Sequence, residues 1–591
     1  MNEFANSEFI LDILNSLCLS HYTLKNQQIF RRLMITTKFI FVTGGVLSGL
    51  GKGIVVASIG RLLTPQYKVV PVKCDGYLNI DPGTMNPVEH GEVFVLDDGT
   101  EVDLDFGHYE RFMGITCKGD WNLTSGKILQ SLIEQEREGK FLGKTIQVIP
   151  HVTGEITRRW QEIAEQEKAD IMLIEIGGTV GDLENMWFLE AVREMKMKLP
   201  DNHSVLVHLG LIPVIDEQGE QKTKPLQQST IFLRERGLFP DIFIGRSKQK
   251  LTEKTKSKIH WLTGVRPEYI ISDPDVESVY ELPMIFESEG LLEAVGKKLQ
   301  LETQKDLTLW KQYVNQLKSA NKSISIAICG KYTDLADSYK SIIEALQHSG
   351  SHENTKVKIK LLDTSKIEDG AIKVEDVLQG IDGIIIPGGF GKRGCEGKIT
   401  LIKYVREHKI PFLGICLGFQ LAVIEFARNM CGLKDAHSSE LSPDTTHPVI
   451  DLMKSQRSIS KMGGTMRLGT YPAQVSEKSL LAELYSNAAI INERHRHRYE
   501  VNPEYIRLLE DAGLLFSGKS KDGTLMEFLE LKSHPYFIAS QGHNELTSCL
   551  LKPNPLFHGL VKAANKEIEK TFVQPNLNSV SQQSSLKEVA V

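Results

Sequence analysis

Short apolar runs alternate with amphipathic stretches through the first half of the chain. Apolar runs long enough for buried strands lie at Phe39–Thr43, Lys68–Lys73, Asp170–Ile176, Ser204–Leu209 and Asp241–Ile244. Stretches with helical periodicity lie between them, at Gly53–Leu63, Ile128–Glu138 and Thr157–Gln166. Because strands that are apolar on both faces are typical of parallel sheets covered by helices, this pattern predicts an α/β fold.

A second series of the same kind follows a polar stretch with helical character at residues 302–322, which we interpret as an interdomain linker. Its strand candidates are Ser323–Cys329, Val357–Leu362, Gly383–Pro387 and Pro411–Ile415. The expected domains are therefore 34–301 and 323–565. Residues 1–33 are expected to be a flexible extension or a start-site artefact, and the polar residues 566–591 a disordered tail.

Composition narrows the class of protein. The chain has 591 residues, of which 41% are hydrophobic and 24% charged, and a net charge of −6. This charge argues against a nucleic-acid partner, and no apolar run is long enough to predict a membrane span. The eight cysteines form no C-x-x-C pair, so the sequence predicts neither a zinc site nor a disulfide framework.

The loop GGVLSGLGKG, Gly44–Gly53, resembles a phosphate-binding loop with two departures from the usual pattern. Val46 stands where the first glycine is usual, and Gly53 replaces the hydroxyl residue that normally contacts magnesium. Glycines before a helix can still turn backbone N–H groups toward an anion, and Lys52 would meet the outer phosphates. A glycine-rich turn with a chance lysine is the alternative.

Carboxylates elsewhere could replace the missing magnesium ligand. In EVDLDFGHYE, Asp103 and Asp105 are expected to share one face of an extended run. Glu175 ends an apolar strand, which is where ligands bind in parallel sheets. Lys73, Lys222 and Lys224 could neutralise a second triphosphate, although each alone is also consistent with a surface lysine.

A second set of residues indicates acyl transfer through a thioester. Cys416 in the segment IPFLGICLGFQ occupies the serine position of a nucleophile elbow. His543 and Glu545 in QGHNEL could supply the base and the group that orients it. The glycine turn in GIIIPGGFG, residues 383–391, could provide the N–H groups of an oxyanion hole. A buried structural cysteine is the alternative.

Several longer segments together resemble CTP synthases, which use glutamine to aminate UTP. They are FVTGGVLSGLGKG, NIDPGTMNPVEHGEVFVLDDGTEVDLDFGHYER, EIGGTVGD, GEQKTKP, PGGFGKRG, PFLGICLGFQ, GGTMRLG and ERHRHRYEVN. The resemblance runs from about Lys38 to Ala564. It implies a P-loop-type parallel-sheet synthetase domain followed by a class I glutamine amidotransferase α/β domain.

The resemblance also implies roles for individual residues. The ATP residues it implies are Gly49, Leu50, Gly51, Lys52, Gly53, Ile54 and Asp105, and the magnesium ligands are Asp105 and Glu175. The residues implied for UTP, or for CTP as inhibitor, are Ser48, Asp182, Leu183, Glu184, Lys222, Thr223, Lys224, Pro225, Leu226, Gln227 and Lys258. The residues implied for the glutamine pocket are Gly389, Leu417, Gly418, Phe419, Gln420, Glu440 and Arg498. Lys52 and Lys73 are implied as catalytic lysines, and Cys416, His543 and Glu545 as the triad.

The activity implied has three steps. ATP phosphorylates the uracil 4-oxygen, Cys416 releases ammonia from L-glutamine, and ammonia displaces the phosphate. A shielded passage for ammonia is expected, because ammonia in neutral water is mostly protonated. Mg²⁺, activation by GTP, a homotetramer, filaments and a cytoplasmic location are further expectations from the family, with no nucleic-acid or membrane partner.

Two other functions are weighed against this one. One is a synthetase of the same layout that acts on a corrinoid or biotin-precursor carboxylate, which the segments around Asp182 and Lys222 argue against. The other is a weakened paralogue that acts as an assembly or filament partner. The intact residues that argue against it are Lys52, Asp105, Glu175 and Cys416.

Five residues depart from the CTP synthase pattern. Gly542 replaces an aromatic residue, Asn544 and Gly76 replace prolines, Leu226 replaces threonine and Phe419 replaces methionine. The loss of a stiff residue at Asn544 predicts weaker or more temperature-sensitive glutaminase activity, since loosely held catalytic groups react more slowly. Leu226 is expected to weaken a hydrogen bond to the pyrimidine nucleotide.

Overall fold

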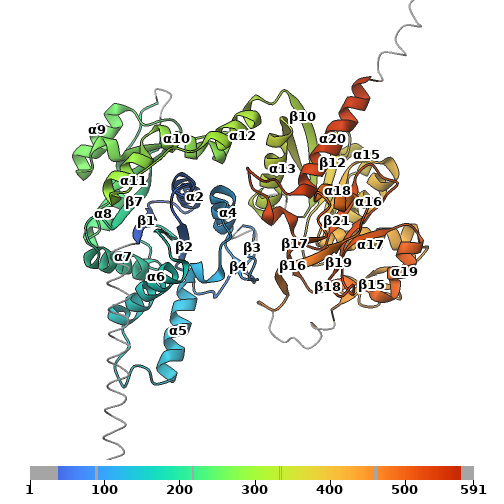
Figure 1. Cartoon of the computed structure of the whole chain (residues 1–591), viewed down its shortest axis with the longest axis horizontal. Helices are drawn as coiled ribbons and strands as arrows, with labels where there is room; N and C mark the ends of the chain where they lie inside the picture. Colours follow the sequence, from blue (N-terminus) through green and yellow to red (C-terminus); the bar gives the residue numbers. More distant parts are fainter. Residues whose placement is uncertain are drawn as a thin grey trace, which may run out of the picture. The chain divides into compact units, whose positions relative to one another are not determined.

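The computed structural model describes residues 37–86, 91–215, 219–331, 333, 336–453, 456 and 464–573. The chain forms two compact units (Figure 1). Unit 1 comprises the described parts of Met1–Ile80 and Asp120–Leu307, and unit 2 those of Asp81–Gly119 and Thr308–Val591. The extension predicted at 1–33 lies outside the described residues. The last helix, α20 (Pro555–Val573), continues past the predicted start of the tail at 566.

Unit 1 contains a seven-stranded parallel sheet of order β5-β2-β6-β1-β7-β8-β9. Its strands are β1 (Lys38–Gly44), β2 (Val69–Asp75), β5 (Asn122–Thr124), β6 (Ile171–Ile176), β7 (Ser204–Leu211), β8 (Ile242–Ser247) and β9 (Ile270–Pro274). Nearly every residue of β1, β2, β6 and β7 is buried. The prediction of a parallel sheet buried on both faces is confirmed.

Two groups of helices cover this sheet (Figure 1). The helices of unit 1 are α2 (Lys52–Leu63), α5 (Ser125–Arg137), α6 (Thr153–Glu167), α7 (Met186–Lys198), α8 (Lys224–Glu235), α9 (Glu253–Thr263), α10 (Leu282–Ser288) and α11 (Leu291–Leu299). Helices α2, α10 and α11 contact one another, and α6 and α7 form a separate pair. Each group packs on its own face, as short β–α connections in a doubly wound sheet require.

Unit 2 is built on a nine-stranded sheet of order β11-β10-β12-β13-β21-β20-β19-β16-β17. Its strands are β10 (Lys322–Gly330), β11 (Thr355–Asp363), β12 (Gly383–Ile386), β13 (Phe412–Ile415), β16 (Arg467–Val475), β17 (Ile490–His497), β19 (Leu515–Ser520), β20 (Met526–Glu530) and β21 (Phe537–Ser540). The pairing is parallel from β11 to β21 and antiparallel beyond it. A small second sheet has the order β14-β15-β18, from β14 (His437–Ser438), β15 (Pro448–Leu452) and β18 (Tyr499–Val501).

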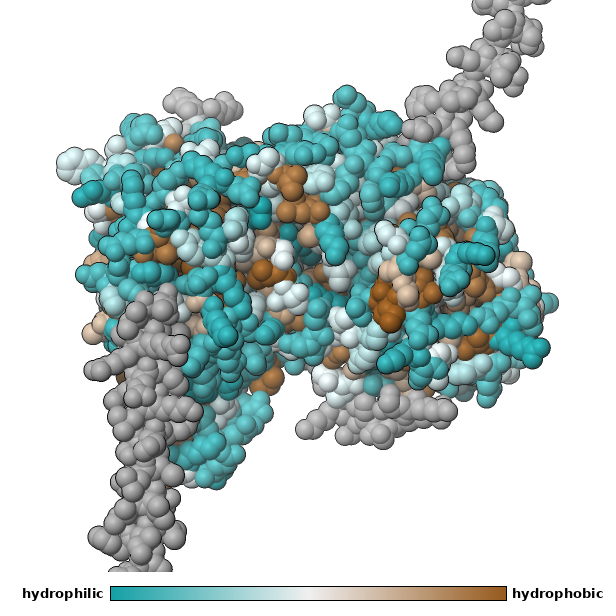
Figure 2. Space-filling model, viewed as in Figure 1, coloured by the Kyte–Doolittle hydropathy of each residue, from teal (hydrophilic) through white to brown (hydrophobic). Residues whose placement is uncertain are grey.

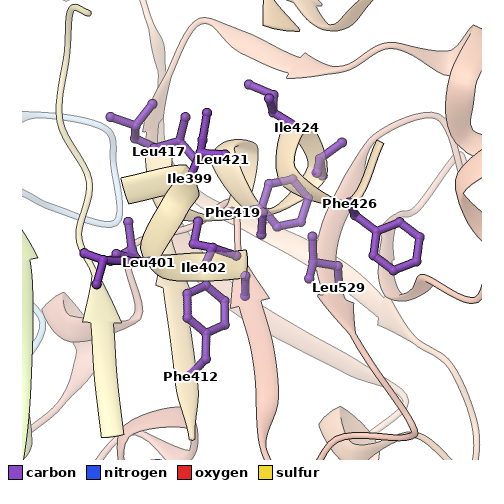
Figure 3. Close-up of a cluster of buried hydrophobic side chains, with 14 of the residues drawn as sticks. Ile399, Leu401, Ile402, Phe412, Leu417, Phe419, Leu421, Ile424, Phe426 and Leu529 are labelled. Atoms are coloured by element: carbon purple, nitrogen blue, oxygen red, sulfur yellow. The ribbon is translucent and has the colours of Figure 1, made fainter. Parts of the chain in front are cut away.

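The two faces of the large sheet carry separate cores, because side chains alternate along each strand. In β12, Ile384 and Ile386 join one cluster while Ile385 joins the other. Figure 3 shows the first cluster, where α16 (Cys395–His408) and α17 (Leu417–Asn429) pack together. The second cluster includes side chains of α13 (Lys340–His352) and α20. The remaining helices of unit 2 are α4 (Asp105–Met113), α12 (Thr308–Ser319), α14 (Ser365–Glu368), α15 (Val374–Val377), α18 (Leu480–Leu484) and α19 (Pro503–Asp511).

The segment Asp81–Gly119 groups with unit 2 although the sequence analysis assigned it to the first domain. It carries the hairpin β3 (Phe94–Val95) and β4 (Glu101–Val102), followed by α4. The guanidinium of buried Arg494 in β17 holds this segment through Glu110, at 2.8 and 3.1 Å. A buried charge needs such a partner, and no pattern along the chain indicates where the partner lies.

The predicted linker contains the amphipathic helix α12, which buries Trp310 and Val314. The face of the molecule in Figure 2 is mainly hydrophilic, with separate small hydrophobic patches. Across the described ranges, no helix has both the length and the apolar character of a membrane span. The cysteines within those ranges are all free.

The core of unit 2 makes a prediction about stability. Leu401 in α16 is fully buried in the cluster of Figure 3. Leu401→Ala should lower the free energy of unfolding of unit 2 by about 2–5 kcal/mol, because it leaves a cavity. Exposed Thr400 on the same helix is the matched control, and Thr400→Ala should change it by less than about 0.5 kcal/mol. Urea unfolding of the full chain measures both, and equal effects would contradict the assignment.

Candidate active sites

The connections of unit 1 leave a crevice at the carboxyl ends of β1 and β6. After β1 the chain passes through α2 to β2, on the β6 side. After β6 it passes through α7 to β7, on the other side of β1. Ligands of open parallel sheets bind where neighbouring connections diverge in this way. The loop that follows β1 and the segment Gly177–Asn185 that follows β6 both start at this edge.

The loop after β1 has the unusual backbone that its glycines suggest. Gly49 and Gly51 have φ of 73° and 102°, and Val46 also has a positive φ of 77°. A β-carbon on Gly44 would come within 2.7 Å of the Lys52 side chain, which lies across it. No atom lies within 4 Å of the β-carbon position at Gly49 or Gly51, so both backbones face open space. The loop can therefore present backbone N–H groups to an anion at the start of α2.

Three charged side chains gather at this edge. The Nζ of buried Lys52 donates to the carbonyl oxygen of Gly178 at 2.7 Å. Lys73 in β2 is paired in register with Glu175 in β6, so both lie at neighbouring positions. Both are buried, at 5% and 1% exposure. These residues were predicted from separate segments of the sequence, and the sheet register places Lys73 beside Glu175.

A pocket of about 390 Å³ opens beside the loop. Leu47, Ser48 and Gly49 line one side, and Arg246, Lys248 and Asp275 are among the other lining residues. Arg246 lies near the carboxyl end of β8 and is not among the residues predicted from the sequence. Its Nη2 lies 2.8 Å from Asp275. The sequence signal that could have found it is its position near the end of a buried strand.

The other residues implied for the pyrimidine nucleotide differ in exposure. Asp182, Leu183, Glu184, Lys224 and Lys258 are exposed, and Lys222 pairs with Glu220. Thr223 is buried at the N-terminus of α8, Pro225 and Gln227 are half-buried, and Gln227 Nε2 donates to Thr223 Oγ1 at 2.7 Å. Leu226 is fully buried in the apolar cluster around Phe243, so its side chain fills the core.

The expectation of an extended run through Asp103 and Asp105 is wrong. Asp105 begins α4, and Leu104 before it already has helical dihedral angles. Asp103 Oδ1 accepts a hydrogen bond from the backbone N of Asp105 at 3.1 Å. The Asp103 side chain therefore accepts from a backbone N–H at the start of the helix, whereas Asp105 is the first residue of the helix. Asp105 belongs to unit 2 and Glu175 to unit 1.

The predicted nucleophile elbow is present at Cys416. This residue lies between β13 and α17 with φ 51° and ψ −98°, outside the regions that a side chain prefers. Its backbone N donates to the carbonyl oxygen of Ser540 at 2.7 Å. Gly418 must be glycine here, because a β-carbon would lie 2.1 Å from the Ile386 oxygen. Cys416 is 5% exposed and stands at the N-terminus of a 13-residue helix.

The predicted base and its orienting acid are bonded to each other. His543 Nδ1 and Glu545 Oε1 are 2.7 Å apart, and both residues are buried or nearly so. The segment is not extended, because a 3₁₀ turn (Asn544–Thr547) starts after His543. Burial alone would lower the pKa of His543, but Glu545 and Cys416 outweigh it and raise that pKa to about 10. The remaining ring nitrogen, Nε2, is left for the thiol.

A cavity of about 200 Å³ lies in front of these residues. Cys416, His543 and Gly388 line it, together with Glu92 and Arg496. A β-carbon on Gly388 would come within 2.9 Å of the His543 ring. The glycine turn therefore does more than supply N–H groups, because it also leaves room for the catalytic imidazole.

The residues implied for glutamine have different surroundings. A β-carbon on Gly389 would lie 3.7 Å from Leu417 Cδ2. Burial raises the pKa of Glu440. Arg498 donates to Gln456 Oε1 at 2.6 Å and to Thr465 Oγ1 at 2.9 Å. The Phe419 side chain instead points into the core (Figure 3).

Two polar groups near Cys416 are absent from the sequence predictions. Gln541 Nε2 donates to Cys416 Sγ at 3.8 Å, and the Cys416 thiol donates to the Arg496 carbonyl oxygen at 3.7 Å. Gln541 stands within QGHNEL, two residues before the predicted base, but nothing in that pattern indicates a contact with sulfur. Arg496 also binds Glu101 at 2.7 Å. Most of the basic run ERHRHRYE is buried or half-buried.

Comparison with known proteins decides the family. The model for the CTP synthase N-terminus matches residues 38–301, and that for class I glutamine amidotransferases matches 334–563. CTP synthases of Pyrococcus abyssi and Archaeoglobus fulgidus are 52% and 51% identical to the chain, covering 90% of it and 98% of each relative. The chain belongs to the CTP synthase family. A solved Trypanosoma brucei CTPS glutaminase domain with bound acivicin is 37% identical, covering 41% of this chain and 94% of that one, with a TM-score of 0.39.

Two departures from the CTP synthase pattern have a structural counterpart. A β-carbon on Gly76 would meet Glu184 at 2.7 Å, and one on Gly542 would come within 3.0 Å of the Arg494 oxygen. Both glycines thus allow another segment to come close. The third, Asn544, is fully buried, and the polar group beside its side chain is Glu493.

Asn544→Pro should increase glutaminase turnover of this CTP synthase homologue. Proline is tolerated at the first position of a helical turn, and it would stiffen the backbone between His543 and Glu545. We expect a higher kcat for glutamine hydrolysis and a higher temperature of half-inactivation. Exposed Lys532→Ala is the control and should change neither value. No gain from Asn544→Pro in either measurement would contradict the prediction.

The raised pKa of His543 predicts a pH-dependent stability. The pKa of His543 in the folded protein lies above the ordinary value of about 6.5. The contribution of His543 to the free energy of unfolding is therefore complete below about pH 6.5 and is lost as the pH rises through about 10. The difference in urea midpoint between wild type and Glu545→Gln should therefore shrink between about pH 7 and pH 10. Glu425, whose partner Arg406 keeps its charge, is the control, and the effect of Glu425→Gln should stay constant. A constant effect of Glu545→Gln would contradict the ion pair.

Proposed function

We propose that this protein is a glutamine-hydrolysing CTP synthase that aminates UTP at the expense of ATP. The bonded pair of His543 and Glu545 beside the strained Cys416 elbow carries this proposal, because it supplies a nucleophile, a base and an orienting acid together. The family relationship over both parts of the chain supports the substrates.

Ammonia release would follow from the geometry of unit 2. His543 Nε2 takes the thiol proton, and the sulfur of Cys416 attacks the side-chain amide carbon of glutamine. The C–N bond breaks, the proton from His543 goes to the leaving nitrogen, and ammonia departs. Water then hydrolyses the thioester with His543 as base and gives glutamate. Gly388 and Gly389 would supply N–H groups to the oxyanion.

The synthetase chemistry would take place at the sheet edge of unit 1. The γ-phosphoryl group of ATP moves to the uracil 4-oxygen. Ammonia then displaces phosphate at carbon 4 of the ring. Lys52 and the loop Gly49–Ile54 would hold the ATP phosphates, and Lys73 would stabilise negative charge at the reacting groups. Ser48, the segment Asp182–Glu184, the segment Lys222–Gln227 and Lys258 are proposed for UTP or inhibitory CTP.

A magnesium ion is proposed from the family resemblance, with Asp105 and Glu175 as its ligands, because carboxylate oxygens are the ligands that Mg²⁺ prefers. When bound, the ion neutralises phosphate charge. Glutamine binding is proposed at Gly389, Leu417–Gln420, Glu440 and Arg498. GTP activation, a homotetramer, filaments and a cytoplasmic location are proposals that rest on the resemblance alone.

The variant Cys416→Ala tests the proposal. With UTP, Mg-ATP and either glutamine or ammonium, wild type should form CTP from both nitrogen sources. Cys416→Ala should lose glutamine-dependent CTP formation by more than about 10³-fold, since the nucleophile is gone, and keep the ammonium-dependent rate.

Buried Cys329, which has no role in the proposed chemistry, provides the control, and Cys329→Ala should retain both rates. Loss of both activities in folded Cys416→Ala would contradict separate sites for the two half-reactions. Wild-type protein that forms no CTP from either nitrogen source would refute the proposed function itself.

A further inference from the structure

The buried amide of Gln541 is directed at the sulfur of the proposed nucleophile. Its Nε2 lies 3.8 Å from Cys416 Sγ, and the side chain is fully buried. Gln541 directly follows β21, and its backbone N donates to the Glu527 oxygen at 2.8 Å. An amide nitrogen only donates, so the sulfur is the acceptor in this contact.

A second glutamine fixes the orientation of this amide. Gln420 Nε2 donates to Gln541 Oε1 at 3.3 Å and to the Tyr499 oxygen at 3.0 Å. These two bonds occupy both hydrogens of Gln420 Nε2. If the amide of Gln541 were reversed, it would place one NH₂ against another and an oxygen against the sulfur. The chain of bonds from Tyr499 therefore sets a donor toward Cys416.

The two hydrogen bonds of the sulfur favour different protonation states. The thiol donates to the Arg496 carbonyl oxygen at 3.7 Å, and this bond is lost when the proton leaves. The bond from Gln541 behaves in the opposite way, because a donor binds a negatively charged acceptor more strongly than a neutral one. In a buried site the difference is larger than in water.

We propose that Gln541 is a catalytic residue of the glutaminase site, the donor that stabilises the Cys416 sulfur while it carries negative charge. The charge is present twice in the proposed reaction. It forms when the S–H bond breaks and the proton moves to His543 Nε2, before the sulfur bonds the amide carbon of glutamine. It forms again when the thioester C–S bond breaks and its electron pair returns to sulfur. This inference rests on the proposed glutamine chemistry.

Alkylation of Cys416 by iodoacetamide tests the assignment without any nucleotide. The rate is followed against pH on the Cys416 peptide by mass spectrometry, because Cys431 and Cys549 are also partly exposed. Gln541→Met removes the donor without adding charge, and Gln541→Glu keeps the shape of the side chain and the acceptor for Gln420. Gln541→Met should move the pH midpoint up by about one unit, the size expected for one hydrogen bond to a charged group. Gln541→Glu should move it further up, because a carboxylate beside the sulfur also repels its negative charge.

Glutamine hydrolysis provides the second measurement. In both variants kcat should fall about 10- to 100-fold with a smaller change in KM, because the lost bond matters most when sulfur is charged. Ser540→Ala is the matched control. It removes a buried hydroxyl from the same turn, where Ser540 Oγ accepts from the Gly542 N at 3.0 Å, and should leave the alkylation midpoint in place.

The outcomes separate this inference from the proposed function. An unchanged midpoint in Gln541→Met, with the thermal unfolding of wild type retained, overturns the assignment. A midpoint that Ser540→Ala moves equally would also overturn it, since the effect would then come from the turn. If wild type forms no CTP while both Gln541 variants shift the midpoint, the proposed function fails and the role of Gln541 in the thiol chemistry stands.

Discussion

The strained backbone of Cys416 is the constraint on which unit 2 depends. A residue with a side chain at φ 51° and ψ −98° costs about 1–3 kcal/mol, which the surroundings must offset. The bond from its N to Ser540 and the close approach of Gly414 and Gly418 keep the turn closed. Because β13 and β21 are parallel neighbours, the same turn sets the sulfur beside the segment that follows β21. That segment supplies both Gln541 and His543.

Burial then determines the chemistry that these groups can perform. The ordinary preference of a buried imidazole is to be neutral, yet the carboxylate of Glu545 raises the pKa of His543. Neighbouring His495 and His497 lack such a dominant partner, and burial lowers the pKa of each well below its usual range. The pKa values of histidines within one unit are thus shifted in opposite directions by their surroundings. The carboxylate of Glu545 and the sulfur of Cys416 together distinguish the proposed base from its neighbours.

In unit 1, the candidate binding site is a crevice that forms where the chain connections after β1 and β6 diverge. The loop after β1 needs Gly44 and Gly45 for packing and Gly49 and Gly51 for their backbone angles. Close packing and backbone angles thus each require glycines at their own positions, and the resulting spacing differs from the usual phosphate-loop pattern. Lys52 reaches across Gly44 to Gly178, which ties the loop to the segment after β6.

The sequence by itself determined the parallel sheets, the elbow at Cys416 and the order of the proposed residues, because apolar periodicity and glycine spacing are local signals. Tertiary structure decided what depends on distant parts of the chain. It assigned Asp81–Gly119 to unit 2 through Arg494, buried Leu226 in the core, made Asp105 the start of a helix, and directed Gln541 at the sulfur. Such contacts join residues up to several hundred positions apart, and no local pattern encodes which partner a buried polar group will find.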